Sequence, residues 1–443
     1  MTLARYLCLG VPLVAVLVAV LTAGRDRDAR AAALLAFLAA GIGLAALNEL
    51  ARLAGWHQFA PVDGRFRGMP VDLWIGWAAL WGPLPILLGR RLPLPVVLGL
   101  LLWVDAAAMP ALDRLVHPGP FWWVGEVVGL IAVALPAQLL GRWTAERRHL
   151  RGRVLLQLAA FAVGLLWLMP TTAFEFGDGA WPDASSGWLF PLAQLGFLVA
   201  VPALAAMREF AARGDGTPFP WDPPRRLVTT GPYAYVANPM QVSAIGLILL
   251  TAVATRSATL GVVALLSAAF AMGVAGPHEH GDMRRRFGTD WMRYRRHVRA
   301  WWPRPRPYRP DGPAVLWLDD ECRECRIVRD LLARRDPVAL DLRPAHILGR
   351  PIRRAHYEAD GGSHERGVAA VGRAFEHVGL GWAYVGWLVR LPGIGWLAQV
   401  VTDALIAAPH AARPRAIPNG FVRIAEQNRS GSCRWRCDPG RHE

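Results

Sequence analysis

The chain has 443 residues, of which 53% are hydrophobic and only 19% are charged. Because a soluble domain carries about a quarter charged residues, this composition indicates a membrane protein with a soluble part. It excludes a disordered chain, a fibrous repeat and a disulfide-stapled secreted miniprotein. The net charge is +15 and every basic residue is arginine, for which GC-rich codon usage is the simplest explanation. The arginines lie at the ends of apolar runs, so we expect contact with anionic lipid headgroups and no nucleic-acid partner.

Nine apolar runs predict membrane-spanning helices, each of which needs about 20 mostly apolar residues. The runs cover residues 3–24, 31–50, 71–89, 92–110, 121–140, 154–170, 188–207, 240–255 and 258–276. The eighth run is short unless it begins near Tyr233 and kinks at Pro239. The predicted fold class is therefore mainly α, a polytopic membrane helix bundle, followed by a small α/β domain.

The arginines also predict the orientation of the bundle. They are concentrated after runs one, three, five, seven and nine, whereas the loop 171–187 has three acidic residues and no arginine. Since positive residues favour the cytoplasmic side, we expect a multi-pass protein of the cell membrane. Its N-terminus would lie outside and its C-terminal domain in the cytoplasm. The loop 51–70, with three arginines, is the exception.

Two carboxylates, Asp105 and Glu126, fall inside apolar runs. A carboxylate in hydrocarbon is costly and is a functional-site hypothesis by default. Both would lie near the outer ends of their helices, so we expect them to reach the headgroup region.

The segment 225–303 contains most of the candidate binding and catalytic residues of the membrane part. Gly231-Pro232 and Asn238-Pro239 predict two turns where a loop enters the membrane. Two helices follow that are joined only by Arg256 and Ser257, which predicts a tight antiparallel hairpin. Beyond the hairpin, a helical period places apolar residues on one face and arginines on the other, which is typical of an amphipathic helix lying on the membrane surface. The apolar positions are Met283, Phe287, Trp291, Tyr294 and Val298.

These stretches resemble the isoprenylcysteine carboxyl methyltransferase and phospholipid methyltransferase family over about 80 residues. The matching positions are Gly231, Tyr233, Asn238, Pro239, Glu279, Phe287, Gly288 and Tyr294, with Met283 for a leucine and Trp291 for a tyrosine. Three positions depart from the family pattern: Ala237 replaces an arginine, Gln241 a tyrosine and His280 a second glutamate. These departures lie where the family binds cofactor or substrate, so they bear on substrate type and activity.

The resemblance implies S-adenosylmethionine as cofactor and a lipidic or prenylated small molecule as acceptor. Its implied cofactor-binding residues are Gly231, Tyr233, Tyr235, Asn238, Pro239, Gln241 and Glu279. Glu279 would bind a cofactor amine or act as a base, and Asn238 offers both a donor and an acceptor. Because the hairpin returns the chain to the same face, we expect Asn238 and Glu279 to line one cytoplasm-facing pocket. The alternative is a turn, a hairpin and a surface helix without catalysis.

A second domain follows the proline-spaced residues 304–313. Residues 314–318 predict a strand, 327–335 a helix and 338–342 a second strand, with Cys322 and Cys325 at the strand-to-helix junction. A C-x-x-C pair in this position is the thioredoxin-like redox arrangement. The helix N-terminus would stabilise the thiolate of Cys322 as the attacking group, with Cys325 more buried and resolving.

This domain resembles the DCC-type thiol-disulfide oxidoreductase family over about residues 314–405, through Trp317-Leu-Asp-Asp320-Glu-Cys322-x-x-Cys325 and later tryptophans. Its redox partner is unknown. A zinc site would need Cys433 and Cys437 from the tail, whose spacing is unusual for zinc, and we predict no metal.

The predicted organisation is a helix bundle (1–207), a methyltransferase-like core (208–303), a linker (304–313), a C-x-x-C domain (314–408) and a disordered tail (409–443). The predicted function is a membrane S-adenosylmethionine-dependent methyltransferase acting on a lipid-like or isoprenoid-like acceptor, with a fused oxidoreductase-like domain. The alternatives are a membrane-tethered thiol-disulfide oxidoreductase with an inactive methyltransferase-like part, and a non-catalytic membrane scaffold.

Overall fold

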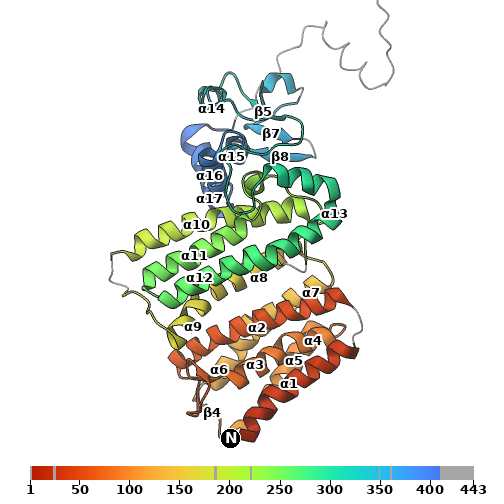
Figure 1. Ribbon diagram of the computed structural model, residues 1–443, viewed down its shortest axis with the longest axis vertical. Helices are drawn as coiled ribbons and strands as arrows, with labels where there is room; N and C mark the ends of the chain where they lie inside the picture. The colour runs from red at the N-terminus through yellow and green to blue at the C-terminus, as the bar shows by residue number, and fades with distance from the viewer. Residues whose placement is uncertain are drawn as a thin grey trace, which may run out of the picture. The chain divides into compact units, whose positions relative to one another are not determined.

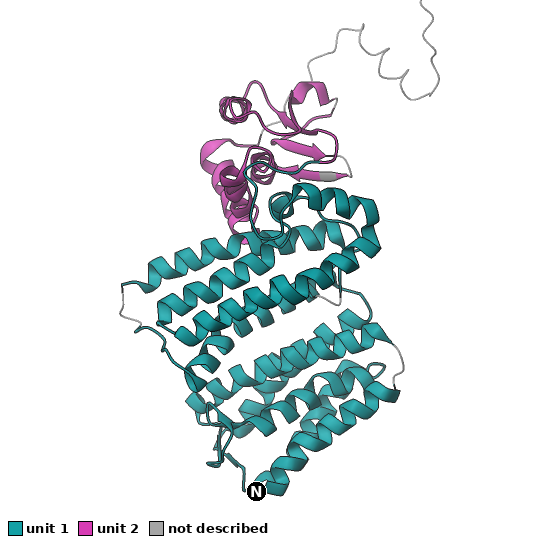
Figure 2. Ribbon diagram, viewed as in Figure 1, with its two compact units in different colours: residues 1–309 teal, residues 310–443 magenta. Residues whose placement is uncertain are grey.

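The computed structural model divides the chain into two compact units, Met1–Arg309 and Pro310–Glu443 (Figure 2). The structure describes residues 2–22, 26–183, 187–219, 222–348, 350–359 and 362–409. The predicted class, a helical membrane bundle with a small α/β region after it, is confirmed. The unit boundary falls inside the expected linker of 304–313. The expected disordered tail lies, apart from Pro409, outside the described residues, as do Cys433 and Cys437.

The first unit is almost entirely helical (Figure 1). Its helices are α1 (Thr2–Thr22), α2 (Arg27–Ala54), α3 (Val71–Trp81), α4 (Pro83–Leu88), α5 (Leu94–Ala108), α6 (Trp122–Gly129), α7 (Leu135–Ala145), α8 (Leu150–Val163), α9 (Met169–Phe176), α10 (Leu189–Glu209), α11 (Pro239–Thr255), α12 (Ala258–Phe270) and α13 (Gly276–His297). Short π-helical turns make α6 continuous with α7, α8 with α9, and α12 with α13.

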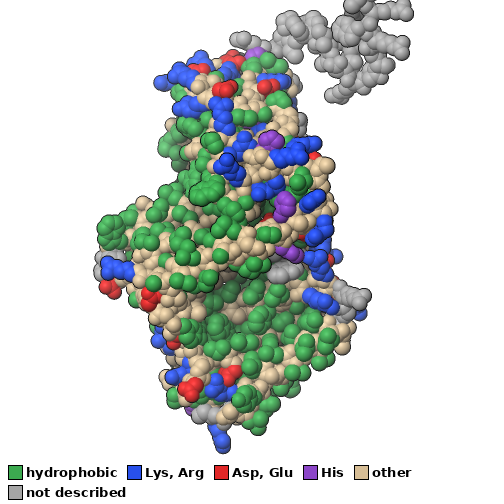
Figure 3. Space-filling model, in the orientation of Figure 1, with side chains coloured by type: hydrophobic (Ala, Val, Ile, Leu, Met, Phe, Trp, Pro, Cys, Tyr) green, Lys and Arg blue, Asp and Glu red, His purple; other side chains and the backbone are tan. Residues whose placement is uncertain are grey.

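Eight helical runs among the described residues are long and apolar enough to cross a membrane. The eighth predicted helix, α11, is not among these runs: it begins at Pro239 and has 17 residues, which is about 26 Å at 1.5 Å per residue. The chain does not extend this helix back to Tyr233, because Gly231–Ala234 forms a separate 3₁₀ turn, η5. Many apolar side chains of the first unit are exposed, as the green surface in Figure 3 shows, which is what lipid-facing helices require.

Local capping fixes the helix ends. The Asp26 side chain accepts a hydrogen bond from the Ala29 amide at 3.0 Å and so begins α2, which ends at Gly55 with φ 67°. The predicted hairpin of α11 and α12 is confirmed, with Arg256 in the left-handed region (φ 51°) and Ser257 capping α12. Side-chain oxygens satisfy the amides that the start of a helix leaves unpaired.

The loops on one side of the bundle meet at its end. Arg147 pairs with Asp28 at 2.9 Å, and Arg90 lies 3.9 Å from Asp26. These contacts bring the α1–α2, α4–α5 and α7–α8 connections together, as expected for helices that cross a membrane in alternate directions.

The core of the amino-terminal helices forms around α2, which lies among α3, α4 and α7 (Figure 1). It holds small residues of α2 against Trp81 of α3 and Val133 between α6 and α7. Two short antiparallel pairs, β1 (His57–Phe59) with β4 (Val116–Pro118) and β2 (Arg65–Phe66) with β3 (Met69–Pro70), lie in the connections.

The expectation that Asp105 reaches the headgroups is wrong. Asp105 is fully buried, and its two carboxylate oxygens accept hydrogen bonds from the indole N–H groups of Trp77 at 2.8 Å and Trp81 at 3.0 Å. The helix turns this side chain toward its neighbours in the bundle, which the position of Asp105 along the apolar run could not reveal.

The second unit is a four-stranded mixed sheet with helices. Its strands are β5 (Ala314–Leu318), β6 (Leu340–Pro344), β7 (His356–Ala359) and β8 (Ser363–Arg366), in the order β6-β5-β7-β8. Its helices are α14 (Arg323–Ala333), α15 (Val368–Phe375), α16 (Leu380–Val389) and α17 (Pro392–Val401). Strand β5 is parallel to β6, whereas β7 is antiparallel to both β5 and β8. The predicted first strand is confirmed, and the predicted second strand begins two residues later, at Leu340.

Candidate functional site

The Gly-Pro-Tyr turn of the first unit is buried, and only glycine fits at its start. Gly231 has φ 62°, and a Cβ there would lie 2.5 Å from Cγ of Glu209. A left-handed backbone conformation in close contact with another side chain is the combination that requires glycine. Gly231 and the five residues after it, up to residue 236, are all buried.

Glu209, at the end of α10, contacts this turn. Its side chain is 3% exposed, and it accepts a hydrogen bond from the Thr230 hydroxyl at 2.7 Å and pairs with Arg213 at 3.1 Å. Sequence reasoning missed Glu209. An acidic residue at the end of an apolar helix, four residues before an arginine, was the available signal.

Tyr233 is held by a hydrogen bond from α13. The buried Tyr294 hydroxyl donates a hydrogen bond to the Tyr233 carbonyl at 2.8 Å. Burial, and then the neighbouring Tyr294, Glu279 and Glu209, raise the pKa of the Tyr233 phenol well above its usual range. The phenol is therefore a neutral hydrogen-bond donor at physiological pH. Glu279, 46 residues further along the chain, lies close enough to this phenol for its charge to matter.

The chain after α13 returns to this loop and pairs with its backbone. The amides of Ala237 and Asn238 donate to the carbonyls of Arg299 and Ala300, at 2.9 and 3.1 Å. The amides of Arg304 and Tyr308 then donate to the carbonyls of Tyr235 and Ala234, at 3.0 and 2.8 Å. Residues 299–308 thus fix the loop that the sequence identified as the candidate cofactor site.

Two buried side-chain oxygens of this segment have no hydrogen-bond partner among the described residues, Tyr233 Oη and Gln241 Oε1. Since buried polar groups are normally satisfied, these two atoms are candidates for contact with a ligand. Asn238 is partly buried, and Pro239 is buried at the first position of α11. Glu279 is exposed on the first turn of α13. A ligand that carries amine and hydroxyl groups fits this donor and acceptor set.

The predicted apolar face of α13 is confirmed, but its surroundings differ from the prediction. Met283, Trp291, Tyr294 and Val298 form a cluster with Tyr308, against which Phe287, Leu227 and Ala237 pack. The face therefore packs on the protein rather than on the bilayer. The helix is also interrupted at Gly288 (φ 51°). His280, the replacement for a glutamate, accepts a hydrogen bond from the Trp291 indole at 3.2 Å.

The second unit presents the C-x-x-C pair at the start of α14. Cys322 is the N-cap residue, and its sulfur accepts a hydrogen bond from the Cys325 amide at 3.4 Å. Both cysteines are free thiols. Burial, together with the hydrogen bond to Cys322, raises the pKa of Cys325 to about 12. An amide of the helix N-terminus thus faces the Cys322 sulfur, and the Cys322 thiol donates a hydrogen bond to the Glu324 carboxylate at 3.4 Å. The raised pKa keeps Cys325 protonated at neutral pH.

The expected order of burial for the two cysteines is wrong. Cys322 is 8% exposed and is the more buried residue, while Cys325 is intermediate. Cys322 is the cap residue of α14 and lies four residues after the end of the buried strand β5, whereas Cys325 lies within the helix.

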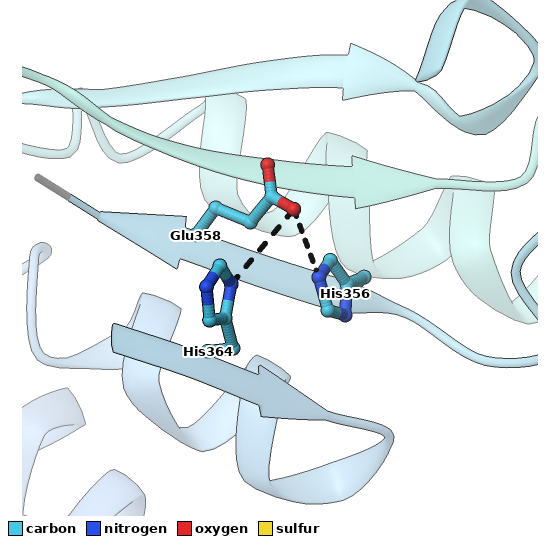
Figure 4. Close-up of side chains that lie close together, drawn as sticks. All are labelled: His356, Glu358 and His364. Atoms are coloured by element: carbon cyan, nitrogen blue, oxygen red, sulfur yellow. Dashed lines mark hydrogen bonds and ion pairs between the residues drawn. The ribbon is translucent and has the colours of Figure 1, made fainter. Parts of the chain in front are cut away.

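A third cluster of possible ligands lies on β7 and β8 of the same unit (Figure 4). The ligand atoms of His356, Glu358 and His364 all lie within 4.8 Å of one another. Arg350 already pairs with the Glu358 carboxylate and lies 3.1 Å from Nε2 of His356. Burial lowers the pKa of His356, against the opposing effect of Glu358. The guanidinium therefore supplies the cation of this cluster, and we assign no metal to it.

Comparison with known proteins identifies a family for the middle part of the chain. A model of the phospholipid methyltransferase family matches residues 190–290. No curated protein and no solved structure matches the chain. The matched segment begins in α10 and ends in α13, so it contains Glu209, the Gly231–Gln241 loop, the hairpin and Glu279. Together with the membrane helices, the match supports a membrane methyltransferase.

Proposed function

We propose that this protein is an integral-membrane S-adenosylmethionine-dependent methyltransferase acting on a lipid-like or isoprenoid-like acceptor. The observation that carries the proposal is the coincidence of the family match at 190–290 with one buried loop supported by α10 and α13. The cofactor, when bound, supplies a methyl group on a sulfonium, and its transfer depends chiefly on the position of the acceptor.

The residues of the loop would bind and orient the cofactor. The Glu279 carboxylate would pair with an amine, while the Asn238 amide offers a donor and an acceptor. Tyr233 would donate from Oη and Gln241 would accept at Oε1, the two buried atoms that lack partners among the described residues. Gly231, Tyr235 and Pro239 would contribute backbone and shape, because their side chains are absent or buried. Gln241 and Ala237 would set the substrate preference, as departures from the family pattern.

The acceptor would enter from the bilayer. Helices α11 and α12 expose large apolar side chains, among them Val253, Leu265 and Phe270. A lipidic molecule held between such side chains could approach the loop without leaving hydrocarbon. The arginine-rich loops that meet at one end of the bundle support a cytoplasmic position for that end, with the N-terminus outside the cell and the second unit in the cytoplasm.

Calorimetric titration of the detergent-purified protein with S-adenosylmethionine tests the proposal. We expect saturable binding that Glu279→Ala and Asn238→Ala each weaken at least tenfold. Asp290→Ala is the matched control, since Asp290 is an exposed acid of the same helix that pairs with the exposed Arg293. The absence of binding to the intact protein, or equal affinity in Glu279→Ala and Asp290→Ala, would contradict the assigned site.

A second candidate function rests on the asymmetry of the C-x-x-C pair. We propose that Cys322 attacks a substrate disulfide and that Cys325, which keeps its proton, resolves the mixed disulfide. This would make the second unit a thioredoxin-like thiol-disulfide oxidoreductase. It would be either a second activity fused to an active methyltransferase or the sole activity, anchored in the membrane by an inactive methyltransferase-like part. Exposure of Cys325→Ser to a small disulfide should trap an adduct on Cys322. A protein in which neither single variant forms an adduct would not be an oxidoreductase.

A further inference from the structure

The amino-terminal helices contain a cavity outside the segment considered above. Its walls come from α2, α3 and α6 and from the strands β1 and β4. The cavity has a volume of about 80 Å³ and opens to the surface. The lining is mainly aromatic and aliphatic, with one acid and one imidazole. The residues that matter here are Phe59, Trp74, Trp77, Trp81, His57 and Glu126.

The three tryptophans of this cavity have their polar edges bonded to the protein. The Trp74 indole donates to the Gly41 carbonyl at 2.7 Å, and those of Trp77 and Trp81 donate to the two oxygens of Asp105. Trp74 also stacks on Phe66, with ring centroids 5.1 Å apart. Apart from the Trp74 face that Phe66 covers, the π surfaces of the indoles are therefore what remains to face a ligand.

Two carboxyl groups, those of Glu126 and Asp105, lie at the cavity, and no arginine is among its described lining residues. Glu126 lines it, and Glu126 and Asp105 interact electrostatically. Neither acid forms an ion pair with any part of the chain that the structure describes. Burial lowers the pKa of His57, so this imidazole is neutral at pH 7. Acids inside apolar helices without a counter-charge are costly in a membrane protein and point to a functional site.

We infer that this cavity binds a small alkylated organic cation, with Glu126 as its charge partner and the faces of Trp74, Trp77 and Trp81 around it. Tryptophan faces attract cations through the ring quadrupole, and aromatic cages beside a carboxylate recognise quaternary ammonium groups. A bare metal ion fits poorly, because the walls offer few oxygen or nitrogen ligands. Asp105 is a positioning residue, since it fixes two indoles through their N–H groups. The inference is independent of the proposed methyltransferase, whose segment does not include these helices.

Binding of choline tests the inference, with 3,3-dimethyl-1-butanol as its neutral isostere. In maltoside detergent, calorimetry and tryptophan fluorescence should show saturable choline binding at least tenfold tighter than binding of the alcohol. Glu126→Gln should remove that preference without lowering the melting temperature. Glu175→Gln is the matched control, because Glu175 is an exposed acid that lines a different cavity. Equal binding of choline and the alcohol, unchanged choline affinity in Glu126→Gln, or no binding would each overturn the inference.

Two further measurements complete the test. Asp105→Asn should weaken choline more than the alcohol, because misplaced indoles lose the cation preference; a purely structural loss would weaken both equally and would contradict the role of Asp105. Displacement of choline by short-chain phosphatidylcholine, but not by phosphatidylglycerol, would assign the cation to a lipid headgroup. Binding of choline without such displacement would assign it to a soluble amine.

Discussion

The two candidate sites of this protein differ in the sequence separation of the residues that form them. The C-x-x-C pair is assembled within four residues, since the amide that faces the Cys322 sulfur belongs to Cys325. The Gly231–Gln241 loop instead depends on Glu209 before it and on residues 279–308 after it. The first site should therefore tolerate distant changes, whereas the second should be sensitive to them. The predictions below test this difference, from the largest expected effect to the smallest.

The largest effect is expected between the two thiols. A thiol with a pKa of about 12 is ionised to only about one part in ten thousand at pH 8. In a variant with Cys8, Cys433 and Cys437 replaced by serine, we expect iodoacetamide to modify Cys322 at least a hundredfold faster than Cys325 at pH 8. The rate at Cys325 should rise about tenfold per pH unit up to near pH 11. Peptide mass spectrometry measures both rates.

The same ratio should persist when Gly231→Ala is added, because the pair is built locally. Equal alkylation rates of the two cysteines at pH 8, or a ratio that collapses with Gly231→Ala, would mean that the C-x-x-C pair also depends on distant structure.

Gly231→Ala should be the most destabilising change in the loop. The added methyl group must occupy a left-handed conformation and would lie 2.5 Å from Cγ of Glu209. Strain and overpacking together predict a loss of about 2–4 kcal/mol in the free energy of unfolding. Denaturant titration in detergent measures this loss. Gly261→Ala is the control, since a Cβ there meets open space within a helix, and it should be neutral or slightly stabilising.

Tyr294→Phe should have a smaller effect on the same loop. It removes one buried hydrogen bond, 2.8 Å long, to the Tyr233 carbonyl, and leaves that carbonyl unpaired at a cost of about 1–3 kcal/mol. The variant should lower the melting temperature and weaken binding of S-adenosylmethionine together. Tyr6→Phe, at a side chain that is 71% exposed, should change neither. A Tyr294→Phe protein as stable as Tyr6→Phe would show that α13 does not support the loop.

The smallest effect is expected at the cluster on β7 and β8. Arg350 pairs with Glu358, but its side chain is 53% exposed. Arg350→Ala should therefore cost less than about 1 kcal/mol in the free energy of unfolding. It should also raise the pKa of His356, since Arg350 is one of the charges that lower it. A histidine titration followed by NMR checks the direction; a lower pKa in the variant would contradict the assigned contact.

The sequence by itself determined the helical class, the α11–α12 hairpin and the C-x-x-C turn. Each depends on residues that are close together in the sequence. The helical class follows from the length of the apolar runs, the hairpin from the two residues Arg256 and Ser257, and the C-x-x-C turn from a cap residue before a helix. The 3.6-residue period also found the buried face of α13, because the same residues are apolar whether they meet lipid or protein.

Only the tertiary structure decided what the apolar face of α13 contacts, which groups bond to Asp105 and which side chain lies against Gly231. Lipid and a protein core select the same apolar residues, so the sequence could not distinguish burial against Tyr308 from contact with the bilayer. The two indoles that bond to Asp105 belong to Trp81 and Trp77 of α3, which are 24 and 28 residues away in the sequence. The close approach of Glu209 to Gly231 likewise depends on the packing of α10. Contacts between distant segments follow from how helices pack, and periodicity carries no information about the partner.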